Sequence, residues 1–175
     1  MPDETTKSRL EQIVELLRAH NVEFIVIGGQ AEILLGGARV TFDVDLCYRR
    51  TKGNLEVLAR ALRTLGPTLR GAPADLPFRI DAESLALGCN FTFSTALGDL
   101  DLLGHLEPLG GYEELVERAT TERVGDVEVK VIGLDDLIRI KQYINRPRDR
   151  DSLMQLLAIK RIREESKRPK NDQPR

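Results

Sequence analysis

Two aspartates, Asp43 and Asp45, are the residues whose type and spacing first suggest chemistry. Apolar and polar residues alternate over positions 40–46, which predicts a β-strand with both carboxylates on its polar face. Side chains two apart on one strand face lie about 7 Å apart, close enough to bind the same divalent ions. Asp is depleted in strands, and neighbouring like charges are unfavourable without a cation. The pattern therefore indicates either a metal site or a solvated strand face.

A third acid, Asp101, lies in the segment 98–103, which follows a second alternating segment at 90–95. Gly98 is a turn signal, and Leu100 and Leu102 flank the aspartate, so the two segments are predicted to form a hairpin. Beside the first acidic strand, Asp101 would complete a three-acid site of the kind that binds two metals for phosphoryl transfer. Asp99 points to the same face but lies nearest the turn, where Asp is ordinary.

Gly28 and Gly29 follow an apolar run at 24–27 and precede a helical pattern at 31–35. Glycines between a strand and a helix leave free backbone amides at the positive end of the helix, which is a suitable seat for phosphate. The alternative interpretation is a tight turn that needs glycine and binds nothing.

Four short runs of the sequence together resemble a known signature. Residues 26–31 (VIGGQA) and 37–46 (GARVTFDVDL) resemble the G-G-x-A … R-x-T-x-D-x-D signature of the minimal nucleotidyltransferases of the DNA polymerase beta-like superfamily. Residues 134–141 (LDDLIRIK) and 146–149 (RPRD) are similar to a stretch found in the branch that contains the nucleotidyltransferase toxins of type IV toxin-antitoxin systems. The resemblance covers about residues 22–159.

This resemblance implies a metal-dependent enzyme that moves a nucleoside monophosphate from a nucleoside triphosphate to an acceptor hydroxyl. The implied cofactor is Mg²⁺ or Mn²⁺, and the acceptor is left open between RNA, a protein and a small molecule. A toxin role would add a cognate antitoxin as partner. The implied catalytic and metal-binding residues are Asp43, Asp45 and Asp101, and the implied nucleotide-binding residues are Gly28, Gly29, Arg39, Thr41, Lys141 and Arg148.

Several of these assignments have a structural alternative. The Arg39 guanidinium would pair with phosphate or with Asp45, or form a plain structural salt bridge. Lys141 and Arg148 would reach the triphosphate, or merely belong to a polar helix face. The alternative for the whole chain is a catalytically idle nucleotidyltransferase-like binding or regulatory protein. Three crowded carboxylates favour activity, because an idle site gains nothing from them.

The predicted elements place these residues in an α+β fold, with a small mixed, largely antiparallel sheet flanked by helices. Thr5 or Thr6 is expected to cap the first helix, and Asn54 a later one that ends at Gly66. Strands are expected at 24–27, 40–46, 90–95, 98–103, 121–124 and 127–132, and further helices at 112–118, 135–143 and from 147 onward.

The composition bounds the class of protein. A chain of 175 residues with 41% hydrophobic residues suits one domain, expected over 1–159. Residues 160–175 are basic, and we expect a flexible tail there. A net charge of −2 gives no global case for a nucleic-acid coat protein. Cys47 and Cys89 are expected to be buried hydrophobes in a cytoplasmic protein, and no apolar run is long enough to predict a membrane span.

Overall fold

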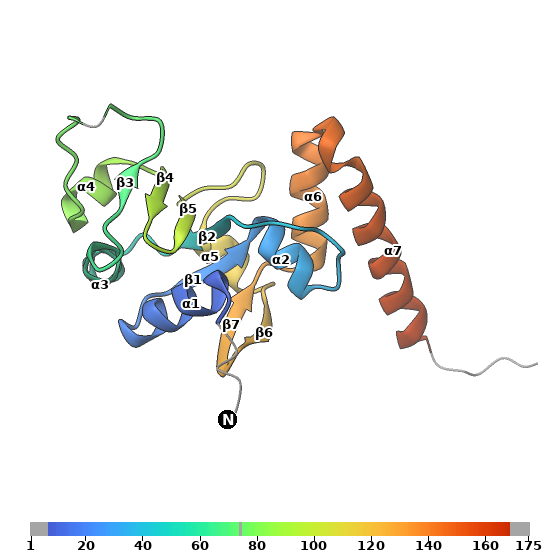
Figure 1. Ribbon diagram of the computed structural model, residues 1–175. Helices are drawn as coiled ribbons and strands as arrows, with labels where there is room; N and C mark the ends of the chain where they lie inside the picture. Colours follow the sequence, from blue (N-terminus) through green and yellow to red (C-terminus); the bar gives the residue numbers. More distant parts are fainter. Residues whose placement is uncertain (1–6, 74, 169–175) are drawn as a thin grey trace, which may run out of the picture.

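The computed structural model describes residues 7–73 and 75–168. Within this part of the chain, one mixed sheet is flanked by helices (Figure 1). Its strands are β1 (Phe24–Ile27), β2 (Val44–Tyr48), β3 (Thr68–Leu69), β4 (Asn90–Thr95), β5 (Gly98–Leu103), β6 (Thr120–Val124) and β7 (Val127–Val131). The helices are α1 (Arg9–Ala19), α2 (Gly28–Leu34), α3 (Lys52–Arg63), α4 (Ala82–Leu87), α5 (Tyr112–Val116), α6 (Leu134–Ile144), the 3₁₀ turn η1 (Pro147–Asp149) and α7 (Arg150–Lys167).

The strand order is β3-β4-β5-β2-β1-β7-β6. Neighbours are antiparallel at β3–β4, β4–β5, β1–β2 and β6–β7, and parallel at β2–β5 and β1–β7. The predicted α+β class with a largely antiparallel sheet is therefore confirmed. The sheet centre consists of β5, β2 and β1, whose buried apolar residues form much of the core. Central strands have paired backbone on both sides, which makes them a rigid platform for side chains at their ends.

The segment before β2 differs from the prediction. The strand starts at Val44 rather than at residue 40, and Val40 and Phe42 are 82% and 68% exposed. The alternation over 40–43 is therefore not a buried strand face. This stretch is instead a loop, and Gln30 Nε2 donates to the carbonyl oxygens of Thr41 and Asp43, each at 3.4 Å.

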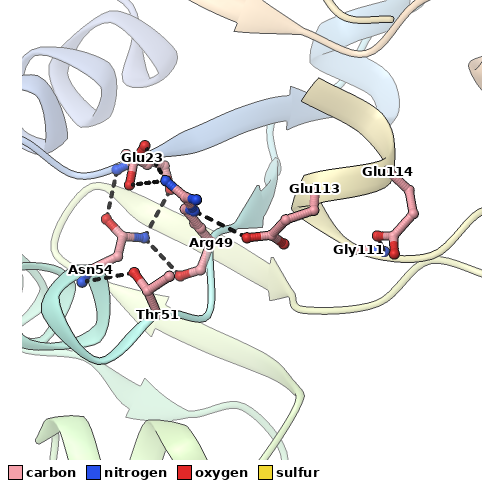
Figure 2. A network of polar contacts seen from close by, with 7 residues as sticks. All are labelled: Glu23, Arg49, Thr51, Asn54, Gly111, Glu113 and Glu114. Atoms are coloured by element: carbon pink, nitrogen blue, oxygen red, sulfur yellow. Dashed lines mark hydrogen bonds and ion pairs between the residues drawn. The ribbon is translucent and has the colours of Figure 1, made fainter. Parts of the chain in front are cut away.

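The start of α3 also differs, and the difference is informative (Figure 2). Thr51, not Asn54, is the N-cap residue, and its side chain accepts from the Asn54 backbone N–H. The buried Asn54 amide accepts from the Glu23 backbone N–H at 2.7 Å and donates to the carbonyl oxygens of Glu23 and Arg49. Arg49 in turn bonds the carboxylates of Glu23 and Glu113. These contacts fix the β1–β2 pair at the end opposite Gly28 and Asp45.

Three other predictions change with the structure. Thr5 and Thr6 lie outside the described residues, and Ser8 caps α1. Cys89 is exposed, because it lies in the connection before β4, whereas Cys47 is buried as expected. Helix α7 continues to Lys167, so residues 160–167 are helical rather than a flexible tail, and residues 169–175 lie outside the described part. Within that part, no helix is both long and apolar enough to span a bilayer.

Candidate active site

The acidic strands meet at one end of the sheet centre. Parallel pairing of β2 with β5 puts Asp45 directly opposite Asp101. In a registered pair of parallel strands, opposite residues point to the same sheet face, so the two carboxylates are neighbours. Asp43 lies in the exposed loop just before β2. The condition set by the sequence, that the Asp101 strand lies beside the strand of Asp45, is therefore met.

Asp45 is electrostatically strained by this arrangement. Burial raises the pKa of its carboxyl group to about 6, and the negative charges of Asp101 and Asp43 add to the increase. Burial likewise raises the pKa of Asp101, against the opposing charge of Arg70. Carboxylates whose ionised forms are disfavoured by burial and by one another lack a full set of compensating cations. Such a group of oxygen donors favours a hard divalent ion.

The glycine pair packs against these acids. Gly28 has φ +64°, and a Cβ at this position would overlap the Asp45 carboxylate. A Cβ on Gly29 would lie 2.9 Å from Thr41 Cγ2. Both positions require the absence of a side chain, so the glycines are explained by close approach of the backbone to the Asp45 strand. The backbone N–H of Gly29 also acts to lower the pKa of Asp45.

All nine residues predicted for the site line one cavity of about 820 Å³. The cavity extends from the Asp45–Asp101 edge to α6 and η1, and a volume of this order accommodates a ligand of nucleotide size. Part of the lining is apolar. Leu103 and Leu106 contribute from the end of β5 and the segment after it, and α6 contributes Leu137, Ile140 and Ile144. The predicted residues in its lining are Gly28, Gly29, Arg39, Thr41, Asp43, Asp45, Asp101, Lys141 and Arg148.

Two cations of the lining are tied to acids that sequence reasoning missed, Glu32 and Asp149. Lys141 Nζ lies 3.0 Å from Glu32 Oε2 and 3.6 Å from Asp149 Oδ1. Arg39 Nη1 lies 3.1 Å from Asp149 Oδ1 and 3.9 Å from Glu32 Oε2. Arg39 thus pairs with Asp149 rather than with Asp45. Asp149 was visible as the last residue of the RPRD run, whereas Glu32 gave no signal beyond an acid in an apolar helix.

Glu32 is the most unusual member of this cluster. It is fully buried, and neither of its carboxylate oxygens has a partner that meets hydrogen-bond geometry. Asp149 is different. Burial acts to raise the pKa of its carboxyl group, but the Arg39 hydrogen bond and the charges of Lys141 and Arg146 hold the pKa below its usual range. The cluster joins α2 to α6 and η1, and so fixes both walls of the cavity relative to each other.

This cluster predicts a large effect on stability. Replacing Lys141 by methionine leaves the buried Glu32 without its nearest cation, and we expect the free energy of unfolding to fall by about 3–5 kcal/mol. Adding Glu32→Gln to Lys141→Met removes the uncompensated charge and should recover part of the loss. Urea unfolding of wild type, both single variants and the double variant measures the coupling. Strictly additive losses would contradict the pairing.

A further cation reaches the acids from outside the cavity. Arg70, directly after β3, contacts both Asp99 and Asp101. Asp99 therefore is not an ordinary turn residue, as its place beside Gly98 suggested. Side-chain hydrogen bonds from Arg70 and Ser94 lower the pKa of its carboxyl group. In the described part of the chain, no three His, Cys, Asp or Glu side chains are grouped closely enough to hold a metal ion as they stand.

Comparison with known proteins identifies the fold. The structure matches the lincomycin-bound lincosamide antibiotic adenylyltransferase LnuA with a TM-score of 0.59 at 14% identity, covering 86% of this chain and 96% of that one. It matches ANT(2")-Ia in complex with adenylyl-2"-tobramycin with a TM-score of 0.56 at 14% identity, covering 85% and 86%. The chain has the nucleotidyltransferase fold. A Thermotoga maritima protein classed with the nucleotidyltransferases matches at 0.52 and 12% identity, covering 85% and 90%.

Of the three comparisons, the one with solved structures identifies the fold. No protein-family model matches the sequence, and a search of curated proteins gives no match. At 12–14% identity the likeness concerns the backbone, so residue roles must come from the geometry of this chain.

Proposed function

We propose that this protein is a metal-dependent nucleotidyltransferase, which moves a nucleoside monophosphate from a nucleoside triphosphate to an acceptor hydroxyl. One observation carries the proposal. The Asp45–Asp101 pair stands at the edge of a cavity whose lining also contains the glycine pair and four cations, Arg39, Lys141, Arg146 and Arg148. Carboxylates and cations that line one cavity suit a metal-bound triphosphate.

In this proposal Asp43, Asp45 and Asp101 hold Mg²⁺ or Mn²⁺. The donors suit such an ion in kind, since they are carboxylate oxygens and Asp45 is crowded by negative charge. Because the three side chains are not grouped closely enough as they stand, they would have to close around the ion. When bound, the ions would neutralise developing charge on the phosphate oxygens and lower the pKa of the acceptor hydroxyl. Asp101 then accepts the proton of that hydroxyl while the hydroxyl oxygen forms a bond to the α-phosphorus. The bond from the α-phosphorus to the bridging oxygen breaks, and pyrophosphate leaves.

Nucleotide binding is assigned to the remaining lining residues. Gly28 packs against Asp45 and Gly29 against Thr41, and the cations Lys141, Arg146 and Arg148 line the same cavity. Arg148 is exposed, and no ion-pair partner for it lies within 4.0 Å among the described residues, so it is the cation most available to phosphate. Lys141 and Arg39 are shared with Glu32 and Asp149 and act as fixed charges.

Transfer of label tests the proposal directly. We would incubate the protein with Mg²⁺ or Mn²⁺, each of the four nucleoside triphosphates, and either cell lysate, RNA, or a panel of lincosamides and aminoglycosides. Label on the α-phosphate should appear on an acceptor, whereas label on the γ-phosphate should appear only in pyrophosphate. Transfer of γ-label would instead show a kinase, and no transfer to any acceptor would favour the idle binding protein.

Metal-nucleotide binding gives an acceptor-independent prediction. A ligand that binds only the folded state stabilises it by mass action, so Mn²⁺ with a nucleoside triphosphate should raise the melting temperature. Mn²⁺ alone should raise it less. At one hundred times the dissociation constant, the stabilisation is about 2.7 kcal/mol. Melting curves that coincide with and without metal-nucleotide over a wide concentration range would contradict the assigned site.

Two biological roles fit the proposed activity. The resemblance of residues 134–141 and 146–149 to the toxin branch supports a type IV toxin with a cognate antitoxin. Two of the structural neighbours, LnuA and ANT(2")-Ia, support an antibiotic-modifying enzyme instead. Unpaired Cys47 and Cys89 support a reducing, cytoplasmic location. Growth arrest on expression of the wild type but not of Asp45→Asn would support the toxin role. Antibiotic resistance on expression would support the antibiotic-modifying role.

A further inference from the structure

Arg70 reaches the acids from the edge of the sheet. Strand β3 pairs with β4 at the end of the strand order (Figure 1). Arg70 is the residue directly after β3. The Arg70 backbone N–H donates to the carbonyl oxygen of Thr92 at 2.9 Å. Thr92 is the β4 partner of Asp101. This hydrogen bond fixes where the Arg70 side chain starts, one strand away from the acid that it contacts.

The guanidinium makes a two-pronged contact with β5. Nη1 lies 2.9 Å from Asp99 Oδ2, and Nη2 donates to Asp101 Oδ1 at 2.5 Å. Asp99 Oδ1 in turn accepts from Ser94 Oγ at 3.0 Å. Asp99 and Asp101 are two residues apart and so share a strand face. Both terminal nitrogens of the Arg70 guanidinium are thus held, Nη1 by Asp99 and Nη2 by Asp101.

This contact differs from an ordinary surface ion pair. An exposed ion pair contributes little to stability, because its attraction is screened by solvent and two long side chains lose conformational freedom when they pair. Here the acids are short side chains on a central strand, and the Asp101 side chain is only 23% exposed. The two nitrogens of the planar guanidinium are held in fixed directions and contact one carboxylate each, which adds orientation to charge. The hydrogen bond from Arg70 therefore fixes the orientation of the Asp101 carboxylate through Oδ1. Among the described residues, Oδ2 has no such partner.

We propose that Arg70 is a positioning residue of the active site, which orients Asp101 through Oδ1 and weakens the binding of a free divalent ion by the three acids. This inference rests on the proposed nucleotidyltransferase function. A fixed positive charge beside the acids repels a cation, while a triphosphate brings enough negative charge to offset it. The ion is then bound tightly only together with the nucleotide. Orientation of Asp101 favours proton transfer from the acceptor hydroxyl.

The test measures metal affinity and turnover separately. Free Mn²⁺ is followed by electron paramagnetic resonance during titration of the nucleotide-free protein, and turnover is followed by α-label transfer. For Arg70→Gln, we expect the Mn²⁺ dissociation constant to fall about three- to tenfold, because one repelling charge is removed. Turnover should fall at least about tenfold, because Asp101 loses its orientation. If Arg70 had a merely structural role, its replacement would weaken Mn²⁺ binding and also lower turnover.

Two further variants sharpen the result. Arg70→Lys keeps the charge but not the fork, so it should bind free Mn²⁺ like the wild type while turnover stays reduced. Arg79→Gln removes another exposed arginine, from the connection between β3 and α4, and should change neither quantity. If Arg70→Gln unfolds, Arg70→Lys decides, and equal turnover of Arg70→Lys and wild type would then overturn the inference.

The outcomes separate the two proposals. A wild type that binds Mn²⁺ and transfers nucleotide, with an Arg70→Gln variant unchanged in both quantities, overturns the role of Arg70 and leaves the proposed function standing. Weaker Mn²⁺ binding by Arg70→Gln also overturns it. A wild type that neither binds Mn²⁺ at millimolar concentration nor transfers label from any nucleotide overturns both.

Discussion

Replacing Asp45 by asparagine is expected to abolish nucleotidyl transfer while making the metal-free protein more stable at neutral pH. Loss of one charged ligand from a site of crowded acids removes several kcal/mol of transition-state stabilisation, so transfer should fall at least about a thousandfold. Stability should change in the opposite direction, because burial and the charges of Asp101 and Asp43 disfavour the ionised Asp45 carboxylate. The opposite signs of these two changes distinguish a functional residue from a structural one.

The sign of the pH dependence follows from the pKa of Asp45. In the folded protein this pKa is raised from 3.8 to about 6, so the folded state holds the proton more tightly than the unfolded chain. The wild type therefore loses stability as pH rises from about 4 to above 6, on the order of 3 kcal/mol from this group. Asparagine does not titrate, so the advantage of Asp45→Asn should be present at pH 7.5 and vanish near pH 4.

Urea unfolding in metal-free buffer at several pH values measures this difference. Asp126→Asn is a matched control, because Asp126 is 97% exposed at the turn between β6 and β7, away from the acids. The control should show neither the gain in stability nor the loss of transfer. An Asp45→Asn variant whose stability parallels that of the wild type at every pH would contradict the crowding described above.

Asp101→Asn is expected to lower the rate of transfer by at least about a hundredfold, the lower end of what a positioned general base contributes. Asp101 lies opposite Asp45 and lines the cavity. Asp99 is on the same strand face but is bonded to Ser94 and Arg70 and does not line the cavity. Asp99→Asn should therefore lower the rate by no more than about tenfold, through a looser Arg70.

Side-by-side values of kcat/KM for the two variants, with the same acceptor, decide which acid acts. Melting curves for both variants check that each is folded. A large loss for Asp99→Asn with a nearly normal Asp101→Asn would show that the β2–β5 register is shifted by two residues, which places Asp99 opposite Asp45. The proposed geometry of the site would then be wrong.

Local sequence patterns predicted several of the elements that position the candidate site residues. The apolar run before Gly28 predicted the strand correctly, although α2 begins at Gly28 itself rather than after a separate Gly-Gly turn, and the hairpin signal at Gly98 fixes the face of Asp101. These features depend on residues close in the chain, where side-chain alternation and glycine conformation are decisive. All nine predicted residues line one cavity, but it is the packing of separate elements that brings them together there. The same local rules failed over residues 40–43, because alternation alone does not say whether a face is buried.

Only the tertiary structure decided which distant residues meet. The pairing of β2 with β5, the ion pairs of Lys141 with Glu32 and of Arg39 with Asp149, and the contact of Arg70 with Asp101 all join separate segments. Arg39 and Asp149 are 110 residues apart in the chain. A charged residue carries no local mark of its partner, since the pairing depends on how whole elements pack and which carboxylates are thereby removed from water. The sequence determined the acids and glycines of this site, and packing determined the cations that hold them.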